Sequence, residues 1–239
     1  TDVDAVAIDA GLTPDDVRAT REDGNLVLTI LSTGDKVTVQ HHFLGGAYAL
    51  EEVRFADGTV WDATVLDALV RTATDGDDYL VGGDADDTFD GLGGNDEIHG
   101  GAGNDVLSGG AGQDALYGED GNDTLDLGTS DAGSSNTADG GKGDDVLTGG
   151  NDGYDELYGG EGNDTLDGMG GEDYLSGGDG EDILDGGAGD DQLDGGRGSD
   201  IYVFGIGSGA DTIYNSSSPA YDEEGNELIL AYLNRGEFI

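Results

Sequence analysis

The middle of the chain repeats every nine residues, and this period constrains the fold more than any other feature of the sequence. The units, such as GGAGNDVLS at 100–108, run from 82 to 126 and again from 140 to 203. They number twelve, of which 149–158 is one residue longer, and 74–81 is a partial unit before them. A repeat this short cannot bury its own apolar surface, so it predicts a solenoid whose stability comes from stacking.

Position 8 of each unit is a large apolar residue, whereas positions 1, 2 and 4 are mostly glycine. One apolar side chain in nine residues cannot form the stripe of an amphipathic helix, which needs about three to four in two turns. It suits a short strand in which only position 8 points inward, preceded by a tight turn that glycine permits. Two units then form an 18-residue coil, and we expect an all-β fold, a parallel β-roll.

Position 6 is aspartate in every unit. Stacked turns of this kind offer carboxylates and exposed backbone carbonyls, which are the oxygen ligands that Ca²⁺ prefers, whereas Mg²⁺ demands a tighter octahedron. Because successive units alternate between the two sides of a roll, we expect a site between each unit and the next but one, nine Ca²⁺ ions in all, or eleven if stacking continues across the interruption. The candidate ligands are Asp78, Asp87, Asp96, Asp105, Asp114, Asp123, Asp145, Asp155, Asp164, Asp173, Asp182, Asp191 and Asp200.

Two of these candidates stand in units that depart from the pattern. Ala85 replaces the glycine at position 4 in the unit of Asp87, and the extra residue of 149–158 shifts Asp155. We therefore expect the sites of Asp87 and Asp155 to be the least regular. In three other units the second glycine is replaced, by Leu92, Glu119 and Met169.

The charge of the chain is concentrated in the repeats. Asp and Glu number 54 against 8 Lys and Arg, a net charge of −46, and residues 73–203 hold 35 acidic side chains against Lys142 and Arg197. This balance argues against binding of nucleic acid or anionic membrane, which requires basic patches, and favours cations as partners. Without metal, carboxylates stacked at the ~4.8 Å strand spacing repel one another. We expect the metal-free repeats to be disordered and calcium binding to be linked to folding.

Residues 127–139, LGTSDAGSSNTAD, break the period with small polar residues. Because the break is short, we predict one turn enlarged by thirteen residues into a surface loop. The alternative is a pair of separate rolls joined by a flexible linker.

The segments on either side of the repeats have a different texture. The N-terminal module, 1–72, is predicted to be a small α+β unit, and the C-terminal segment, 204–239, a cap. The apolar pattern of 5–17 matches that of 227–239, which suggests that a second copy of the N-terminal module begins there. Within 1–72 we predict a hairpin of 25–31 with 36–41, a strand pair of 49–56 with 59–61, and a helix over 62–71 capped by Asp62 or Thr64.

Several classes of function find no motif in the sequence. There is no cysteine for disulfides or zinc–thiolate sites, no apolar run of about 18 residues that would predict a membrane span, and no signal peptide at Thr1. HExxH, GxSxG and EF-hand spacings are missing, so we expect no catalytic activity in this chain. The His41–His42 pair could bind a transition metal, although a solvated strand end is favoured, and His99 is predicted to point outward.

The sequence disfavours two further uses of the repeats. Acidic composition is typical of a disordered solvating tail, but the strict recurrence of an apolar position 8 disfavours it. Ice binding needs a regular ladder of threonine or Asx, and positions 7 and 9, read in chain order, show none.

GGAGNDVLS and GGEGNDTLD (159–167) resemble the nonapeptide GGxGxDxUx of repeats-in-toxin (RTX) proteins. GLTPDDV (11–17) and FADGTVW (55–61) resemble the haemolysin-type calcium-binding-protein-related domain, and FGIGSGADTIY (204–214) is similar to the usual exit from the roll. The resemblance implies Ca²⁺ at the position-6 aspartates, type I secretion, and a secreted, extracellular or bacterial cell-surface location. The parent protein would be a toxin, protease, lipase or adhesin. The alternative is an adhesive or ligand-binding accessory module for a protein or glycan.

Overall fold

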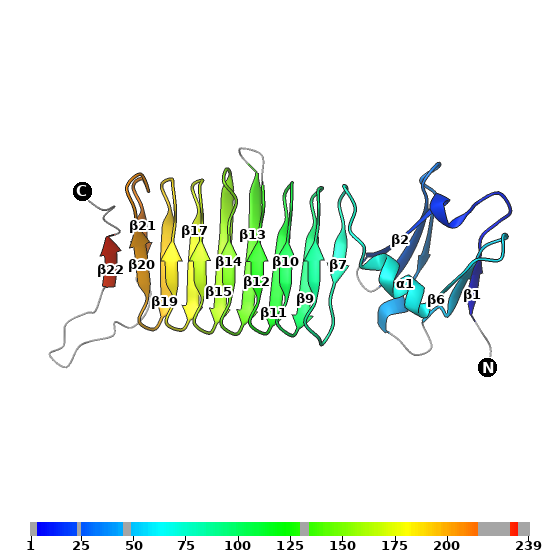
Figure 1. Cartoon of the computed structure of the whole chain (residues 1–239), viewed down its shortest axis with the longest axis horizontal. Helices are drawn as coiled ribbons and strands as arrows, with labels where there is room; N and C mark the ends of the chain where they lie inside the picture. Colours follow the sequence, from blue (N-terminus) through cyan, green and yellow to red (C-terminus); the bar gives the residue numbers. More distant parts are fainter. Residues whose placement is uncertain (1–3, 23–24, 45–48, 130–133, 215–229, 234–239) are drawn as a thin grey trace, which may run out of the picture. The chain divides into compact units, whose positions relative to one another are not determined.

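The computed structural model describes residues 4–22, 25–44, 49–129, 134–214 and 230–233. The chain divides into two compact units, Thr1–Ala73 and Thr74–Ile239, which are coloured blue to cyan and cyan to red in Figure 1.

The N-terminal unit contains two small sheets. One is antiparallel and is formed by β2 (Val17–Glu22), β3 (Asn25–Ile30) and β4 (Lys36–Val39). In the other, β5 (Glu52–Arg54) pairs in parallel with β1 (Ala5–Ala7) and antiparallel with β6 (Val60–Asp62). Two short 3₁₀ helices, Pro14–Asp16 and His42–Leu44, connect these strands. The predicted hairpin and strand pair are confirmed.

One helix, α1 (Ala63–Val70), ends this unit. It begins where the Asp62 carboxylate accepts a hydrogen bond from the N–H of Val65 at 3.0 Å, so the predicted helix and its Asp62 cap are confirmed. Leu66 and Val70 face a conventional core that the sheets complete with Leu26, Val53, Phe55 and Trp61.

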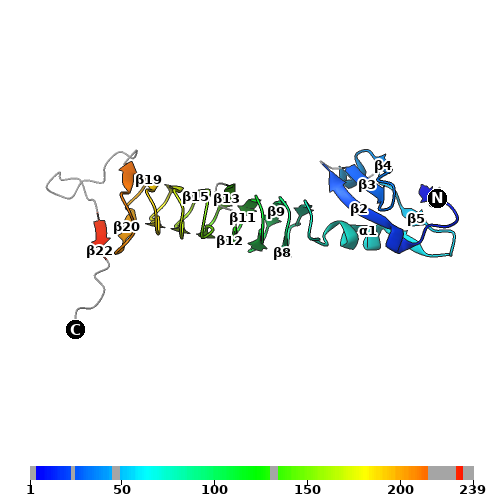
Figure 2. The same cartoon turned by 90° about the horizontal axis from the view of Figure 1, so that it is seen from above.

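The second unit is a β-roll of two parallel eight-stranded sheets, and successive strands alternate between them. Figure 1 shows the strands side by side along the roll, and Figure 2 gives the view turned by 90°. The first sheet holds β7 (Tyr79–Val81), β9 (Glu97–Ala102), β11 (Ala115–Asp120), β13 (Ser135–Lys142), β15 (Tyr154–Glu161), β17 (Tyr174–Asp179), β19 (Gln192–Arg197) and β21 (Thr212–Tyr214). The second holds β8 (Thr88–Asp90), β10 (Val106–Ser108), β12 (Thr124–Asp126), β14 (Val146–Thr148), β16 (Thr165–Asp167), β18 (Ile183–Asp185), β20 (Ile201–Phe204) and β22 (Leu230–Leu233).

The position-8 side chains form the core of the roll, and the predicted β-roll is confirmed. Each lies in register with its counterpart one coil away, as Leu107 does with Leu125. Every position-8 residue from Leu80 to Tyr202 is buried, and the exposed fraction of its side chain does not exceed 7%. Close stacking requires glycine at position 4. A Cβ at Gly121, for example, would overlap the carbonyl oxygen of Gly103 in the neighbouring turn.

The prediction of a surface loop over 127–139 is wrong. Ser135–Lys142 forms β13, which pairs with β11 on one side and β15 on the other. Ala138 occupies position 8 and is fully buried, and Asn136 occupies position 6. The coil that separates Asp114 from Asn136 has 22 residues instead of 18, so the true insertion is only four residues. The segment hides a degenerate unit that spans 127–139 and includes the insertion, and in it Thr129 bridges Ala111 at position 3. The unit was hidden because an amide and a methyl group replace the expected carboxylate and large side chain at positions 6 and 8.

The alternative of two separate rolls is also wrong. β12 pairs directly with β14 across the interruption, as Leu125 does with Leu147. At the C-terminal end, β21 adds a last strand to the first sheet, and the backbone of β22 pairs in parallel with β20. The proposed second copy of the N-terminal module at 227–239 lies outside the described residues, except for 230–233.

The outer faces of the two sheets differ. Position 7 of the second sheet is β-branched in seven successive strands of that sheet, from β8 to β20, whereas the first sheet carries aromatic rings on its own outer surface. Successive units alternate between the two sheets, so positions 7 and 9 read in chain order come from both faces in turn and show no ladder. The β-branched row is Thr88, Val106, Thr124, Val146, Thr165, Ile183 and Ile201, and the rings include Tyr79, His99, Tyr117, Tyr158 and Tyr174.

Replacing Met169 by glycine is expected to stabilise the roll. Met169 has a φ of +67° at a turn position where most units have glycine, and its side chain is 40% exposed. The left-handed conformation costs a residue with a Cβ about 1–2 kcal/mol, and the chain entropy of glycine removes part of the gain. Urea unfolding of the Ca²⁺-loaded protein should show Met169→Gly more stable than wild type by up to about 1 kcal/mol. Met169→Ala, which keeps the Cβ, should show no such gain. Equal stability of the two variants would contradict the claim that the left-handed backbone at Met169 is strained.

Candidate metal-binding turns

The position-6 side chains form two columns, one in the turns on each side of the roll. In each column the backbone N–H of position 6 donates to Oδ1 of position 6 in the next coil. The N···O distance is 2.8 Å from Asp164 to Asp182 and 2.9 Å from Asp173 to Asp191. The first column, in the turns before the strands of the β7 sheet, holds Asp78, Asp96, Asp114, Asn136, Asp155, Asp173, Asp191 and Asp211. The second holds Asp87, Asp105, Asp123, Asp145, Asp164, Asp182 and Asp200.

The second carboxylate oxygen, Oδ2, is buried without a hydrogen-bond partner in nine of these aspartates. A buried polar atom normally has a partner, and an ionised carboxylate without one carries a large desolvation penalty. Each of these oxygens therefore marks a place that suits a cation or a proton. They belong to Asp96, Asp105, Asp114, Asp123, Asp145, Asp164, Asp173, Asp182 and Asp191.

Each Oδ2 faces a small space that glycine at position 1 keeps open. A Cβ on Gly177 would meet both Oδ2 of Asp182 and the carbonyl oxygen of Gly195 in the next coil. The same two kinds of oxygen border Gly159, where they come from Asp164 and from Gly177. A carboxylate oxygen and a backbone carbonyl of the adjacent coil thus converge on one space, which is the donor chemistry that Ca²⁺ prefers.

No group of three or more His, Asp or Glu side chains in the described ranges is arranged to hold a metal ion. A cation in these turns would therefore depend on one or two carboxylates together with backbone carbonyls. Such a donor set fits a hard ion of flexible coordination, Ca²⁺, and not Zn²⁺, which takes nitrogen and sulfur ligands.

Burial raises the pKa of these carboxyl groups. Burial, together with the neighbouring carboxylates, raises the pKa of Asp145, Asp173 and Asp182 to about 7 each, although the backbone N–H that donates to Oδ1 opposes the shift. The pKa of Asp164 and Asp191 is raised to about 6 for the same first cause. In the absence of metal, the columns hold protons at pH values where an ordinary aspartate is ionised.

Three of the four remaining candidates differ from these nine in that their Oδ2 accepts a hydrogen bond. Oδ2 of Asp78 accepts the N–H of Thr74 at 2.6 Å, and Oδ2 of Asp87 accepts that of Gly83 at 2.7 Å. Oδ2 of Asp155 accepts the N–H of Gly150 at 2.6 Å. Asp87 and Asp155 are the candidates whose units depart from the pattern, so the irregular sequence coincides with an irregular turn. Asp200 accepts the N–H of Asp182 like the regular members of its column.

Sequence reasoning missed two members of the first column, Asn136 and Asp211. The string NTAD at 136–139 keeps the polar, polar, apolar, acidic order of positions 6 to 9, and Gly140 follows it at the correct spacing. In the same way GADTIY at 209–214 matches positions 4 to 9. A search that tolerated one substitution and a short insertion would have found both.

Comparison with known proteins agrees with this geometry. Residues 72–107, 99–131, 132–152, 150–175 and 167–202 match the RTX calcium-binding nonapeptide repeat (4 copies), and together they cover more than half of the chain. The chain belongs to the RTX calcium-binding repeat family. Residues 25–65 match the haemolysin-type calcium binding protein related domain. The RTX β-roll is a structural calcium-binding module and not a catalytic one.

A curated relative covers part of the RTX chain. The iron-regulated protein FrpA of Neisseria meningitidis serogroup C is 41% identical over 80 residues, which are 32% of this chain and 7% of the relative. The RTX chain therefore spans a small fraction of the length of the relative. Within its described part, no helix is long and apolar enough to cross a membrane.

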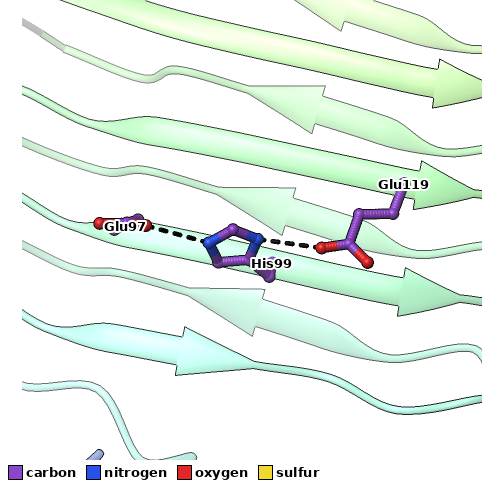
Figure 3. Close-up of polar contacts among 3 residues, drawn as sticks. All are labelled: Glu97, His99 and Glu119. Atoms are coloured by element: carbon purple, nitrogen blue, oxygen red, sulfur yellow. Dashed lines mark hydrogen bonds and ion pairs between the residues drawn. The ribbon is translucent and has the colours of Figure 1, made fainter. Parts of the chain in front are cut away.

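The histidines of the RTX chain make structural contacts. His99 points outward from β9, as predicted, and its ring nitrogens contact Glu119 at 3.0 Å and Glu97 at 3.1 Å (Figure 3). The ring also stacks on Tyr117.

The expectation of a solvated strand end at the histidine pair is wrong for His42. This residue is buried, and its Nδ1 accepts the N–H of Leu50 at 2.9 Å. Burial lowers the pKa of His42, which favours the neutral ring that this hydrogen bond requires. The Nδ1 atom is thereby withheld from a transition metal.

The stability of the metal-free RTX roll is expected to fall as pH rises from about 4 to about 7. The folded state binds more protons than the unfolded state in this window, because the pKa of aspartates such as Asp145, Asp173 and Asp182 lies near 7 when folded, against an ordinary value of 3.8. The destabilisation that comes from ionising these buried carboxyl groups is absent at pH values below the ordinary pKa and complete at pH values above the raised pKa. Circular dichroism in chelator, at low protein concentration and several pH values, measures this change.

The control for the pH dependence is the pair Asp182→Asn and Glu181→Gln. The first removes a buried titrating group and should make the pH dependence shallower, and the second removes an exposed charge from the same turn and should not. A metal-free roll that gains stability as pH rises through this window would contradict the assignment.

Proposed function

We propose that the position-6 carboxylates and the backbone carbonyls of the adjacent coils bind Ca²⁺, and that the roll folds when they do so. The observation that carries the proposal is the set of nine buried Oδ2 atoms without a hydrogen-bond partner. The candidate ligands are the thirteen aspartates given by the sequence, and the nine with a partnerless Oδ2 are the strongest among them. When bound, the ion supplies positive charge to these oxygens.

Charge balance supports the link between calcium and folding. Residues 73–203 carry a net charge of −33, and nine Ca²⁺ ions would bring +18. The apolar core contributes one side chain per nine residues, which offers little against the chain entropy lost on folding. Since an unfolded chain does not hold the ligands together, the free energy of binding becomes free energy of folding.

The module would act in a larger secreted protein. We infer export by type I secretion, in which the chain remains unfolded at low cytosolic calcium and folds outside the cell, at an extracellular or bacterial cell-surface location. The family match and the much longer relative support this inference. An extracellular module of this kind needs only weak sites, with dissociation constants of about 10⁻⁴ to 10⁻³ M.

Calcium titration of the chelated protein tests the link to folding. Far-UV circular dichroism should show a cooperative gain of β-structure with Ca²⁺ and none with Mg²⁺, because the turns supply carbonyls at flexible geometry and not a compact octahedron. The midpoint should lie near 10⁻⁴ to 10⁻³ M. A spectrum already folded in chelator at pH 7.5 would overturn the proposal and favour a constitutive scaffold.

Asp182→Asn tests the ligand assignment. The substitution keeps Oδ1 as an acceptor for Asp164 but removes the charge at the buried Oδ2. We expect the calcium midpoint to rise about tenfold, which corresponds to ~1.4 kcal/mol, and the number of bound ions to fall. Glu181→Gln is the matched control, because it removes an exposed charge from the same turn. If both variants bind calcium equally well, the overall negative charge of the repeats, and not the buried carboxylates of these turns, would account for binding.

The second candidate function is a ligand-binding accessory module of an RTX adhesin or extracellular enzyme. The observation that favours it is the aromatic outer face of the first sheet. There the ring of His99 stacks on that of Tyr117 with 4.7 Å between the ring centroids, and the ring centroids of Tyr158 and Tyr174 lie 5.8 Å apart. Aromatic side chains are enriched at binding surfaces. Glycan-array and pull-down binding at fixed calcium, with Tyr117→Ala and Val146→Ala as variants of the two opposite faces, tests it. Equal binding by both variants would exclude this face.

A further inference from the structure

Two turns of the roll have a backbone unlike that of the others. Eleven described turns between 91 and 198 have a position-2 residue in the left-handed region, with φ between +67° and +112°. Gly83 and Gly150, at the same position in the turns of Asp87 and Asp155, are not in this conformation. Each instead donates its N–H to Oδ2 of the aspartate in its own turn, at 2.7 Å and 2.6 Å.

The sequence explains why these two turns differ. At position 4, glycine has a φ between +119° and +147° in nine turns, a conformation that is costly for residues with a Cβ. Ala85 holds this position in the turn of Asp87 and is not in the left-handed region. The turn of Asp155 contains the additional residue of 149–158. Both changes give the turn a different path, and the position-2 N–H then reaches the carboxylate.

In the turn of Asp155 the hydrogen bonds occupy both carboxylate oxygens. Oδ2 accepts from Gly150, and Oδ1 accepts from Nδ2 of Asn136 at 2.9 Å. Asn136 in turn uses its own Oδ1 to accept the N–H of Asp114 at 2.9 Å. An amide can donate and accept at once, so Asn136 connects the neighbouring coils without adding a charge. Asp155 is completely buried, yet unlike its neighbours it has no partnerless oxygen.

We propose that the turns of Asp87 and Asp155 are closed by their own hydrogen bonds and take no Ca²⁺ ion, and that Asn136 makes the centre of the first column a metal-free joint. The calcium sites of that column then form two separate blocks, one on each side of the joint. The proposal rests on the proposed function, because it assigns which turns of a calcium-binding roll lack the ion. The roll would then bind fewer ions than it has turns, because hydrogen bonds occupy the carboxylate oxygens of these two turns. Substitutions that remove those hydrogen bonds should restore the missing ions.

The central test is Asn136→Asp, measured on the full chain as Ca²⁺ ions per chain by native mass spectrometry and by calorimetric titration. The substitution removes the N–H donor from Oδ1 of Asp155 and places a second carboxylate beside it. We expect at least one additional ion compared with wild type. The control is Asn122→Asp, which adds the same charge at an exposed position of a regular turn and keeps the Oδ1 that accepts from Asp144. Its ion count should not change.

A second variant keeps the proposal testable if Asn136→Asp does not fold. Ala85→Gly restores the glycine at position 4 of the turn of Asp87, which allows the regular backbone and frees Oδ2 from Gly83. It should also gain one ion. Wild-type ion counts for both Asn136→Asp and Ala85→Gly would overturn the proposal, whereas a wild-type chain that binds no calcium would overturn the proposed function itself.

Discussion

The structure depends on how each position-6 carboxylate divides its two oxygens. One oxygen accepts the N–H of the preceding coil and fixes the stacking distance, as Asp182 does for Asp164. The other is thereby drawn into the interior, where nine such atoms have no protein partner. The hydrogen bond that builds the solenoid thus creates the electrostatic cost that a bound cation or a proton must offset.

The remaining features of the roll accommodate this arrangement. Glycine at position 1 leaves room beside Oδ2, glycine at position 4 lets the carbonyls of adjacent turns approach, and a single apolar residue fills the narrow core. A conventional domain gains its stability from a large buried apolar surface. The N-terminal unit does so, with Trp61, Phe55 and Leu66 in one cluster. The roll has a thin core and concentrates its polar chemistry in the turns.

Much of this arrangement follows from the sequence, because a strict period fixes which residues share a column. The strands, the buried position 8 and the column of aspartates could all be predicted from spacing alone. A strict period misses Asn136 and Ala138, because their chemistry departs from the pattern while their backbone keeps it, and only a search that tolerates a substitution and a short insertion recovers them. The occupied oxygens of Asp87 and Asp155 were equally hidden, since the direction of one N–H in a turn depends on local φ and ψ. The segregation of aromatic and β-branched residues became visible only when alternate units were assigned to opposite sheets.

That alternation has a consequence for how such a chain can change its length. Two units make one coil, so each nine-residue unit sets the side on which every later unit lies. Loss or gain of one unit would transfer all later strands to the opposite sheet and would interrupt both the aromatic face and the β-branched row. A whole coil can be added or removed without this exchange, and so can a few residues at the tip of a turn, as the four-residue insertion near β13 demonstrates. The two outer faces therefore stay intact only when the roll is lengthened or shortened by an even number of units.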